Sequence, residues 1–203
     1  MNNEQLLQMY KALSENPGEL VKAAARKRLI NFARYMQPDL VLEPFHVVYY
    51  TLLDMFAHGK IRKMIVQQPP QHGKSEGSSR KLPAFMEGLN PDLKIVIGSY
   101  AATIARDFNR DVQRIIDTPR YRELFPGTYL NGSNVVTMAN TYLRNSDVIE
   151  MVGRKGSLRV VGRGGSLTSK TVDVSILDDV YKDYAEGNSP IVRAAAWKWY
   201  TTV

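Results

Sequence analysis

The sequence predicts an α/β fold, in which a mostly parallel sheet is flanked by helices and an antiparallel hairpin is an optional addition at one edge. Two observations carry this prediction. Short apolar runs typical of buried strands alternate along the chain with longer segments whose apolar residues recur at helical spacing. Strands that alternate with helices form parallel sheets with right-handed crossovers, covered on both faces.

The length of the chain suits one domain of ordinary size or slightly more, because 203 residues that are 44% hydrophobic can bury a core. Residues 1–40 are expected to form a helical preface, since their apolar residues recur at helical spacing. Pro17 and Gly18 interrupt that spacing, which predicts two helices in the preface. Residues 41–203 are then expected to form the main α/β domain.

The main domain is predicted to contain strands at 63–67, 94–98, 147–152, 157–161 and 172–177, of which the third and fourth form a hairpin. Helices are predicted at 45–58, from the turn at residue 73 to about 87, at 103–116 and at 190–200. In the first of these helices, the side chains expected to face the core are Val47, Val48, Leu52, Leu53 and Phe56.

The composition is basic, since Lys and Arg exceed Asp and Glu by 27 to 20 and the pI is about 9.5. This balance suits a polyanionic partner such as nucleic acid, with a merely soluble basic surface as the alternative. The absence of cysteine excludes disulfides and thiolate metal sites and fits a reducing compartment. We find neither a secretory signal nor an apolar run of about 18 residues, so we expect a soluble cytoplasmic protein without a membrane segment.

A phosphate-binding loop is predicted where Gly73, Lys74 and Ser75 follow a predicted strand and open a predicted helix. In such a loop the backbone N–H groups face the phosphates, the lysine reaches the β and γ groups, and the serine hydroxyl ligates Mg²⁺. Gln68 occupies the position of the first glycine in the G-x-x-x-x-G-K-S/T pattern, so a chance tripeptide is the alternative. The predicted cofactors are ATP and Mg²⁺, and the predicted binding residues of the loop are Gln68, Pro69, Pro70, Gln71, His72, Gly73, Lys74, Ser75 and Glu76.

Two adjacent acids, Asp178 and Asp179, end an apolar strand about a hundred residues after the loop. In enzymes with such a loop the first acid holds magnesium and a neighbouring acid orients the attacking water. We therefore assign Asp178, with Ser75, to the metal and Asp179, with Lys74, to catalysis. Without the loop, the two acids would be ordinary turn or helix-cap residues.

Several segments of the chain occur together in one family. The loop has the form Pro-Pro-x-x-Gly-Lys-Ser without the first glycine. The other segments are Gly98-Ser99-Tyr100, Ala105-Arg106-Asp107-Phe108, Tyr121-Arg122-Glu123-Leu124-Phe125-Pro126, Gly164-Gly165-Ser166-Leu167-Thr168, Leu177-Asp178-Asp179, Ser189 and Trp197-Lys198-Trp199-Tyr200. With these, most of the chain resembles the large terminase subunit of tailed double-stranded DNA bacteriophages, the motor that packages the genome and cuts it.

The resemblance implies that residues 41–203 are a P-loop ATPase domain of the ASCE type, which drives translocation of double-stranded DNA into a procapsid. The partners that it implies are double-stranded DNA, the portal protein and a small terminase subunit. It also implies a homo-oligomeric ring at the procapsid portal, in the cytoplasm of the infected bacterial host. Family members continue into a coupling motif and an RNase H-like nuclease domain. We therefore expect a truncated ATPase domain here, with endonuclease activity only in the full-length protein.

The resemblance also suggests roles for residues outside the loop. Relatives often carry Gly-Arg shortly before the acidic strand, where this chain has Ser169 and Lys170. Lys170 and Arg163 are the candidates for a cation that stabilises the transition state, although lysine lacks the planar fork of arginine. His46 lies where terminases approach the adenine ring, with a half-buried helix histidine as the alternative.

Arg106, Arg110 and Arg114 recur at four-residue helical spacing. This row can face DNA phosphates, and a solvated basic stripe is the equal alternative. For the whole chain, a helicase-like nucleic-acid-dependent ATPase and a nucleotide-binding assembly module without turnover are the rival functions.

Overall fold

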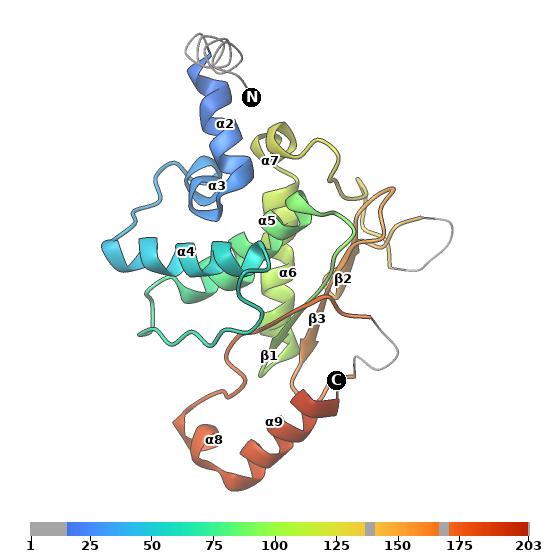
Figure 1. Ribbon diagram of the computed structural model, residues 1–203. Helices are drawn as coiled ribbons and strands as arrows, with labels where there is room; N and C mark the ends of the chain where they lie inside the picture. The colour runs from blue at the N-terminus through green and yellow to red at the C-terminus, as the bar shows by residue number, and fades with distance from the viewer. Residues whose placement is uncertain (1–15, 137–140, 167–170, 203) are drawn as a thin grey trace.

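The computed structural model describes residues 16–136, 141–166 and 171–202 (Figure 1). Its centre is a four-stranded mixed sheet in the order β2-β3-β1-β4. Strand β1 (Lys94–Ser99) runs parallel to both β3 (Ser157–Gly162) and β4 (Val174–Leu177). Strand β2 (Val148–Glu150) pairs antiparallel with β3 at the sheet edge. The predicted α/β class is confirmed, including the antiparallel hairpin at one edge.

The two faces of the sheet are covered unequally. On one face, apolar side chains of β1 and β3 join the main core, and helix α6 (Ala102–Ile116) packs against both strands. On the other face, Val96 and Val161 form a small cluster with Trp199 of helix α9 (Pro190–Thr202). The indole N–H of Trp199 donates to the carbonyl oxygen of Gly165 at 2.9 Å, which fixes α9 on this face.

The predicted preface helix before Pro17 lies outside the described residues, and the one after it differs from its prediction. The single helix expected after residue 18 is two helices, α2 (Pro17–Lys27) and α3 (Leu29–Met36), because Arg28 between them is extended. Asp54, 7% exposed, stabilises this break: it accepts the backbone N–H of Leu29 at 2.8 Å and pairs with the Arg28 guanidinium at 2.9 Å. A buried carboxylate from another helix thus caps the start of α3, which local spacing does not reveal.

Helix α4 (Pro44–Ala57) matches its predicted range, and its predicted core face is right only in part. As predicted, Leu53 is buried and Phe56 packs against the core. Val47, Val48 and Leu52 are instead 43%, 61% and 38% exposed, and Tyr49 and Tyr50 are buried in their place. The helix is apolar almost all round, so spacing alone does not select the buried stripe.

The strand predicted at 63–67 is absent. This stretch is not assigned to a strand and pairs with no described strand, and Ile65 is 92% exposed. An apolar run becomes a strand only when a neighbour accepts and donates its backbone hydrogen bonds. The helix that follows is present, but it consists of a short helical start at 74–75, the π-helix η1 (Glu76–Lys81) and then α5 (Leu82–Leu89).

The remaining predicted elements are confirmed, since α6, α9, β1, β4 and the β2–β3 hairpin lie where expected. Two short helices were not predicted, α7 (Pro119–Leu124) and α8 (Tyr184–Asn188), whose N-caps are Thr118 and Asp183. No helix among the described residues is long and apolar enough to cross a membrane.

Candidate active site

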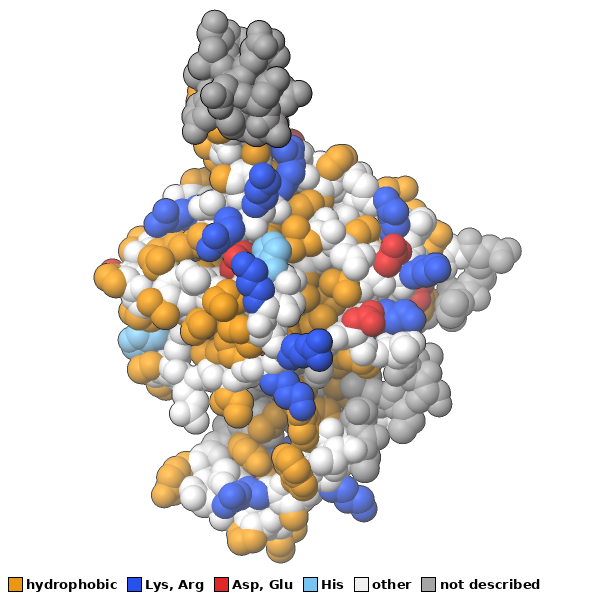
Figure 2. Space-filling model, in the orientation of Figure 1, with side chains coloured by type: hydrophobic (Ala, Val, Ile, Leu, Met, Phe, Trp, Pro, Cys, Tyr) orange, Lys and Arg blue, Asp and Glu red, His pale blue; other side chains and the backbone are white. Residues whose placement is uncertain are grey.

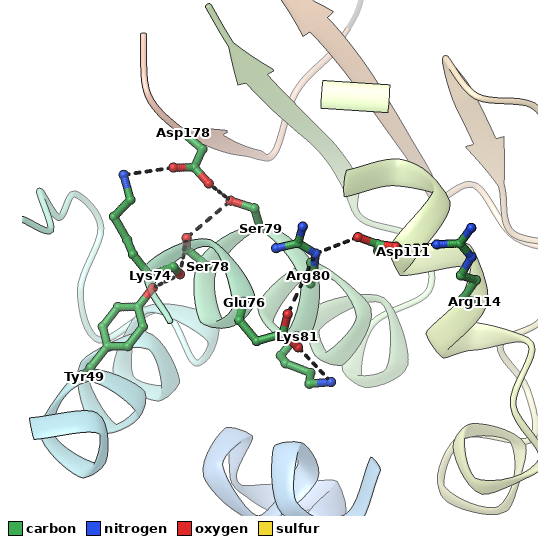
Figure 3. Close-up of polar contacts among 10 residues, drawn as sticks. All are labelled: Tyr49, Lys74, Glu76, Ser78, Ser79, Arg80, Lys81, Asp111, Arg114 and Asp178. Carbon is green, nitrogen blue, oxygen red and sulfur yellow. Dashed lines mark hydrogen bonds and ion pairs between the residues drawn. The ribbon is translucent and has the colours of Figure 1, made fainter. Parts of the chain in front are cut away.

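Lys74 of the predicted loop meets the two predicted acids at the carboxyl end of the parallel strands, and Figure 3 shows its ion pair with Asp178. Asp178 directly follows β4, and its backbone N–H donates to Gly98 of β1 at 2.8 Å. The carbonyl oxygen of Asp179 accepts the N–H of Tyr100 at 2.9 Å. In open α/β sheets this end of the strands is where ligands bind, because loops from several strands converge there.

The loop turns back on itself through left-handed backbone conformations. Gln71 has φ 63° and Gly73 has φ 76°, a region that glycine enters without steric cost. A side chain at position 73 would also meet His46, since a Cβ there would lie 3.4 Å from Nε2 of that histidine. Successive turns of this kind direct backbone N–H groups toward one concave side, which suits an anion.

Two side chains of helix α4 donate hydrogen bonds to the backbone of the loop. His46 Nδ1 lies 3.0 Å from the backbone N–H of Glu43 and accepts its hydrogen bond. Nε2 therefore carries the ring proton and donates to the carbonyl oxygen of His72 at 3.2 Å. The hydroxyl of Tyr49 donates to the carbonyl oxygen of Lys74 at 2.6 Å. His46 thus contacts the loop itself, while Tyr49 was missed because a helix tyrosine gives no sequence signal.

Lys74 lies between the two acids. Its Nζ is 3.0 Å from Asp178 Oδ1 and 2.5 Å from Asp179 Oδ1. The side chain of Asp178 is 3% exposed, whereas that of Asp179 is 62% exposed and its backbone has φ 45°. Burial lowers the pKa of Lys74, but its hydrogen bonds to Asp179 and Asp178 outweigh burial, so the net pKa is raised and the ammonium stays charged.

Asp178 is held ionised by the helix that follows the loop. Burial raises its pKa, but hydrogen bonds from Ser75, Ser79 and Lys74 outweigh this effect, so the net pKa is lowered. Ser79 Oγ donates to Asp178 Oδ2 at 2.7 Å. The sequence analysis named Ser75 and missed Ser79. Residues four apart on a helix lie on the same face, so the serine four positions after Ser75 could have been predicted to face Asp178 as well.

The oxygen donors at this site suit a hard divalent cation such as Mg²⁺. Mg²⁺ binds one or two carboxylates together with water and phosphate oxygens, and Asp178 and the Ser75 hydroxyl are ligands of that kind. Two buried polar atoms, Gln68 Oε1 in the loop and Ser99 Oγ at the carboxyl end of β1, have no hydrogen-bond partner among the described residues. Because buried polar atoms are usually satisfied, these two are available to a bound group.

The predicted binding residue Glu76 faces away from the acids. Its carboxylate pairs with Lys81 at 3.0 Å and lies 3.8 Å from Arg80, and Arg80 in turn pairs with Asp111 at 2.6 Å (Figure 3). Asp111 also pairs with Arg114 at 2.8 Å. A chain of ion pairs therefore connects the loop helix to α6.

The other arginines of the row on α6, like Arg114, are paired with acids. Arg106 pairs with Asp147, and Arg110 pairs with Asp107, each at 2.6 Å. With Arg114 on Asp111, every arginine of the row has an acidic partner. This arrangement favours the solvated stripe over a phosphate-binding row.

Arg163, one of the two candidates for the transition-state cation, binds groups other than the two acids. The guanidinium of Arg163 donates to Val180 O and to Glu186 Oε2, each at 2.9 Å, and this hydrogen bond lowers the pKa of Glu186. Lys170 lies outside the described residues. The remaining loop residues Pro69, Pro70, Gln71 and His72 are exposed beside the site.

Comparison with known protein families, with curated proteins and with solved structures finds no match for this chain. Its function is therefore argued from the site. That site consists of an anion-suited loop, a lysine between two acids, and hydroxyl groups directed at the buried acid.

Proposed function

We propose that the chain is an ATP-hydrolysing domain whose nucleotide phosphates bind the loop 68–75. The observation that supports this most is the position of Lys74, with Nζ 3.0 Å from Asp178 and 2.5 Å from Asp179. Loop and acids are about a hundred residues apart in the sequence, and neither motif alone is specific. Their meeting at the carboxyl end of the strands is what a phosphate-transfer site requires.

In this proposal each residue performs a defined part of the chemistry. Lys74 exchanges its two carboxylate partners for phosphate oxygens, which frees Asp178 to act as a metal ligand beside Ser75. Asp179, which is exposed to solvent, accepts the proton of the attacking water. When bound, Mg²⁺ neutralises charge on the phosphates and polarises the bond that breaks. Tyr49 and His46 hold the loop backbone in position.

We further propose that hydrolysis serves a DNA-packaging motor of the large-terminase kind. The support is the resemblance of the loop, acidic and aromatic segments to that family, together with a net charge of +7. On the face seen in Figure 2, Lys and Arg side chains are spread widely and acidic ones are few. Such a surface suits duplex DNA held by its phosphates without sequence preference. The portal protein, a small terminase subunit and a ring of copies are the proposed partners.

Calorimetry with ATP and Mg²⁺ tests the nucleotide site. We expect the wild type to bind, Lys74→Ala to lose binding, and Asp178→Asn to lose the dependence on Mg²⁺. Lys60→Ala is the matched control, because Lys60 is an exposed lysine outside the loop. A folded wild-type chain that binds no ATP would refute the nucleotide assignment.

Phosphate release with and without duplex DNA then tests the motor. Stimulation by duplex DNA without strand separation favours packaging, whereas unwinding of the duplex favours the helicase-like alternative. ATP binding without phosphate release, with or without DNA, favours an assembly module. These three results separate the proposed function from its two rivals.

A further inference from the structure

The second face of the sheet carries polar residues at the end opposite Lys74. Lys94 of β1 and Glu150 of β2 are both register partners of Ser157 on β3, so the three side chains share one face. Arg159, two residues after Ser157, lies on the same face. Trp199 covers this face near the carboxyl end of β1, whereas the amino end is open.

A cavity of about 300 Å³ lies at this open end. Its lining includes four cationic side chains and one acidic side chain, namely Lys94, Arg154, Lys155, Arg159 and Glu150. The hydroxyl groups of Ser157 and Thr171 also line it. The volume is at the lower limit of small-molecule sites.

The cations of the cavity are only weakly neutralised. Arg159 and Glu150 are 3.8 Å apart, beyond hydrogen-bond distance, and Lys94 Nζ donates to the neutral hydroxyl of Thr171 at 3.0 Å. Arg154 and Lys155 are exposed and have no acidic partner among the described residues. This contrasts with the arginines of α6, each of which pairs with an acid.

Two further acids lie close to the cavity, but each binds a backbone N–H. Asp173 accepts the N–H of Lys94 and Asp92 accepts the N–H of Lys155, both at 2.8 Å. They bring the local charge closer to neutral, and one oxygen of each carboxylate is occupied by a backbone N–H. The lining itself keeps an excess of positive charge.

The turn that carries Arg154 and Lys155 is fixed in place. The N–H of Gly156 donates to the carbonyl oxygen of Pro91 at 3.1 Å, and the N–H of Ser157 donates to that of Leu93 at 2.9 Å. A Cβ at Gly156 would lie 2.1 Å from the Pro91 oxygen, so only glycine allows this close approach. The cationic side chains therefore extend from a rigid backbone, which reduces the entropy lost when a ligand binds.

We propose that this cavity is a second anion site, which takes a phosphate-bearing ligand. Arginine and lysine provide charge-assisted hydrogen bonds to phosphate oxygens, and the two hydroxyl groups can add neutral ones. The site lies roughly 16 Å from the Lys74 site, at the other end of six-residue β1. It is thus separate from the nucleotide phosphates and does not depend on the proposed hydrolysis.

The test uses the Lys74→Ala chain, so that the loop does not contribute to binding. Inorganic pyrophosphate is titrated by calorimetry at low ionic strength without magnesium. We expect binding, and we expect Lys155→Gln/Arg159→Gln in this background to weaken it about tenfold or more, as the loss of charge-assisted hydrogen bonds implies. Lys27→Gln/Arg34→Gln is the control, because both residues are exposed cations on the preface helices.

A competition experiment identifies the source of the phosphate. Short duplex DNA is added to the Lys74→Ala chain with bound pyrophosphate. If DNA displaces the pyrophosphate, and if this displacement is lost when Lys155 and Arg159 are also replaced, the ligand is a polynucleotide backbone. If DNA displaces none, the ligand is a free phosphate compound. Equal pyrophosphate affinity in the two double variants, or no binding by a folded Lys74→Ala chain, would overturn the proposal. Failure of ATP binding at the loop would leave it standing.

Discussion

Replacement of Lys74 by alanine tests whether the lysine stabilises the folded, nucleotide-free chain. Asp178, 3% exposed at its side chain, would lose one of its three hydrogen-bond donors and keep those from Ser75 and Ser79. Complete loss of a partner costs a buried charge about 3–5 kcal/mol. Because two hydroxyl groups remain, we expect a decrease of about 1–3 kcal/mol in the free energy of unfolding. Asp179 adds little, since exposed ion pairs contribute weakly.

The measurement is urea and thermal denaturation of the wild type, Lys74→Ala and Lys60→Ala at pH 7. A decrease of that size lowers the midpoint temperature by roughly 2–12 °C for a chain of this length. A second variant separates charge from packing. In Lys74→Ala/Asp178→Asn the buried side chain is neutral, so part of the lost stability should return.

The effect should depend on pH with a definite sign. The pKa of Asp178 is lowered in the folded chain, so its stabilisation is present above the ordinary aspartate range and is lost as pH falls through the folded pKa. The difference between the wild type and Lys74→Ala is therefore largest near neutral pH and narrows below about pH 4. A Lys74→Ala chain as stable as Lys60→Ala at pH 7 would refute the reasoning.

Two more predictions concern buried polar groups outside the acid pair. Tyr49→Phe removes the hydroxyl that donates to the Lys74 carbonyl oxygen at 2.6 Å. The free energy of unfolding measured by urea denaturation should therefore decrease by about 0.5–1.5 kcal/mol. The control is Tyr129→Phe, which replaces an exposed tyrosine and should change the free energy of unfolding little. Glu87 is fully buried, and neither of its carboxyl oxygens has a hydrogen-bond partner within the part of the chain that the structure describes. Burial, with Asp92 nearby, raises its pKa well above the ordinary value. The folded chain therefore binds a proton that the unfolded chain releases, so wild-type stability falls as pH rises above about 4.3. Glu87→Gln should be more stable than the wild type at pH 8 in thermal melts and lose that advantage near pH 4; an advantage that does not change with pH would contradict the reasoning.

Local patterns in the sequence were sufficient for much of the fold. The spacing of apolar residues predicted α6, α9 and β1, and alternation predicted the β2–β3 hairpin. These signals are reliable because side-chain direction repeats with the backbone period of each element. The candidate residues of the site were also accessible, because a glycine-lysine-serine run that opens a helix and two acids that follow an apolar strand are visible in the sequence.

Features that depend on a distant partner were inaccessible to local patterns. The run 63–67 has the composition of a strand but pairs with no described strand, and the break at Arg28 depends on Asp54 from α4. Helix α4 is apolar on nearly all its sides, so its sequence did not show that Tyr49 would be buried against the loop.

The sequence by itself therefore determined the class of fold, most element boundaries and the identity of Lys74, Ser75, Asp178 and Asp179 as a candidate set. Only the tertiary structure decided that Lys74 lies between the two acids, that Ser79 donates to Asp178, and that Arg163 binds Glu186. It also decided which cations share the open face of the sheet, since that depends on the register of three strands. The physical reason is the same in each case: periodicity sets the direction of a side chain along its own element, whereas its partner is set by how elements pack.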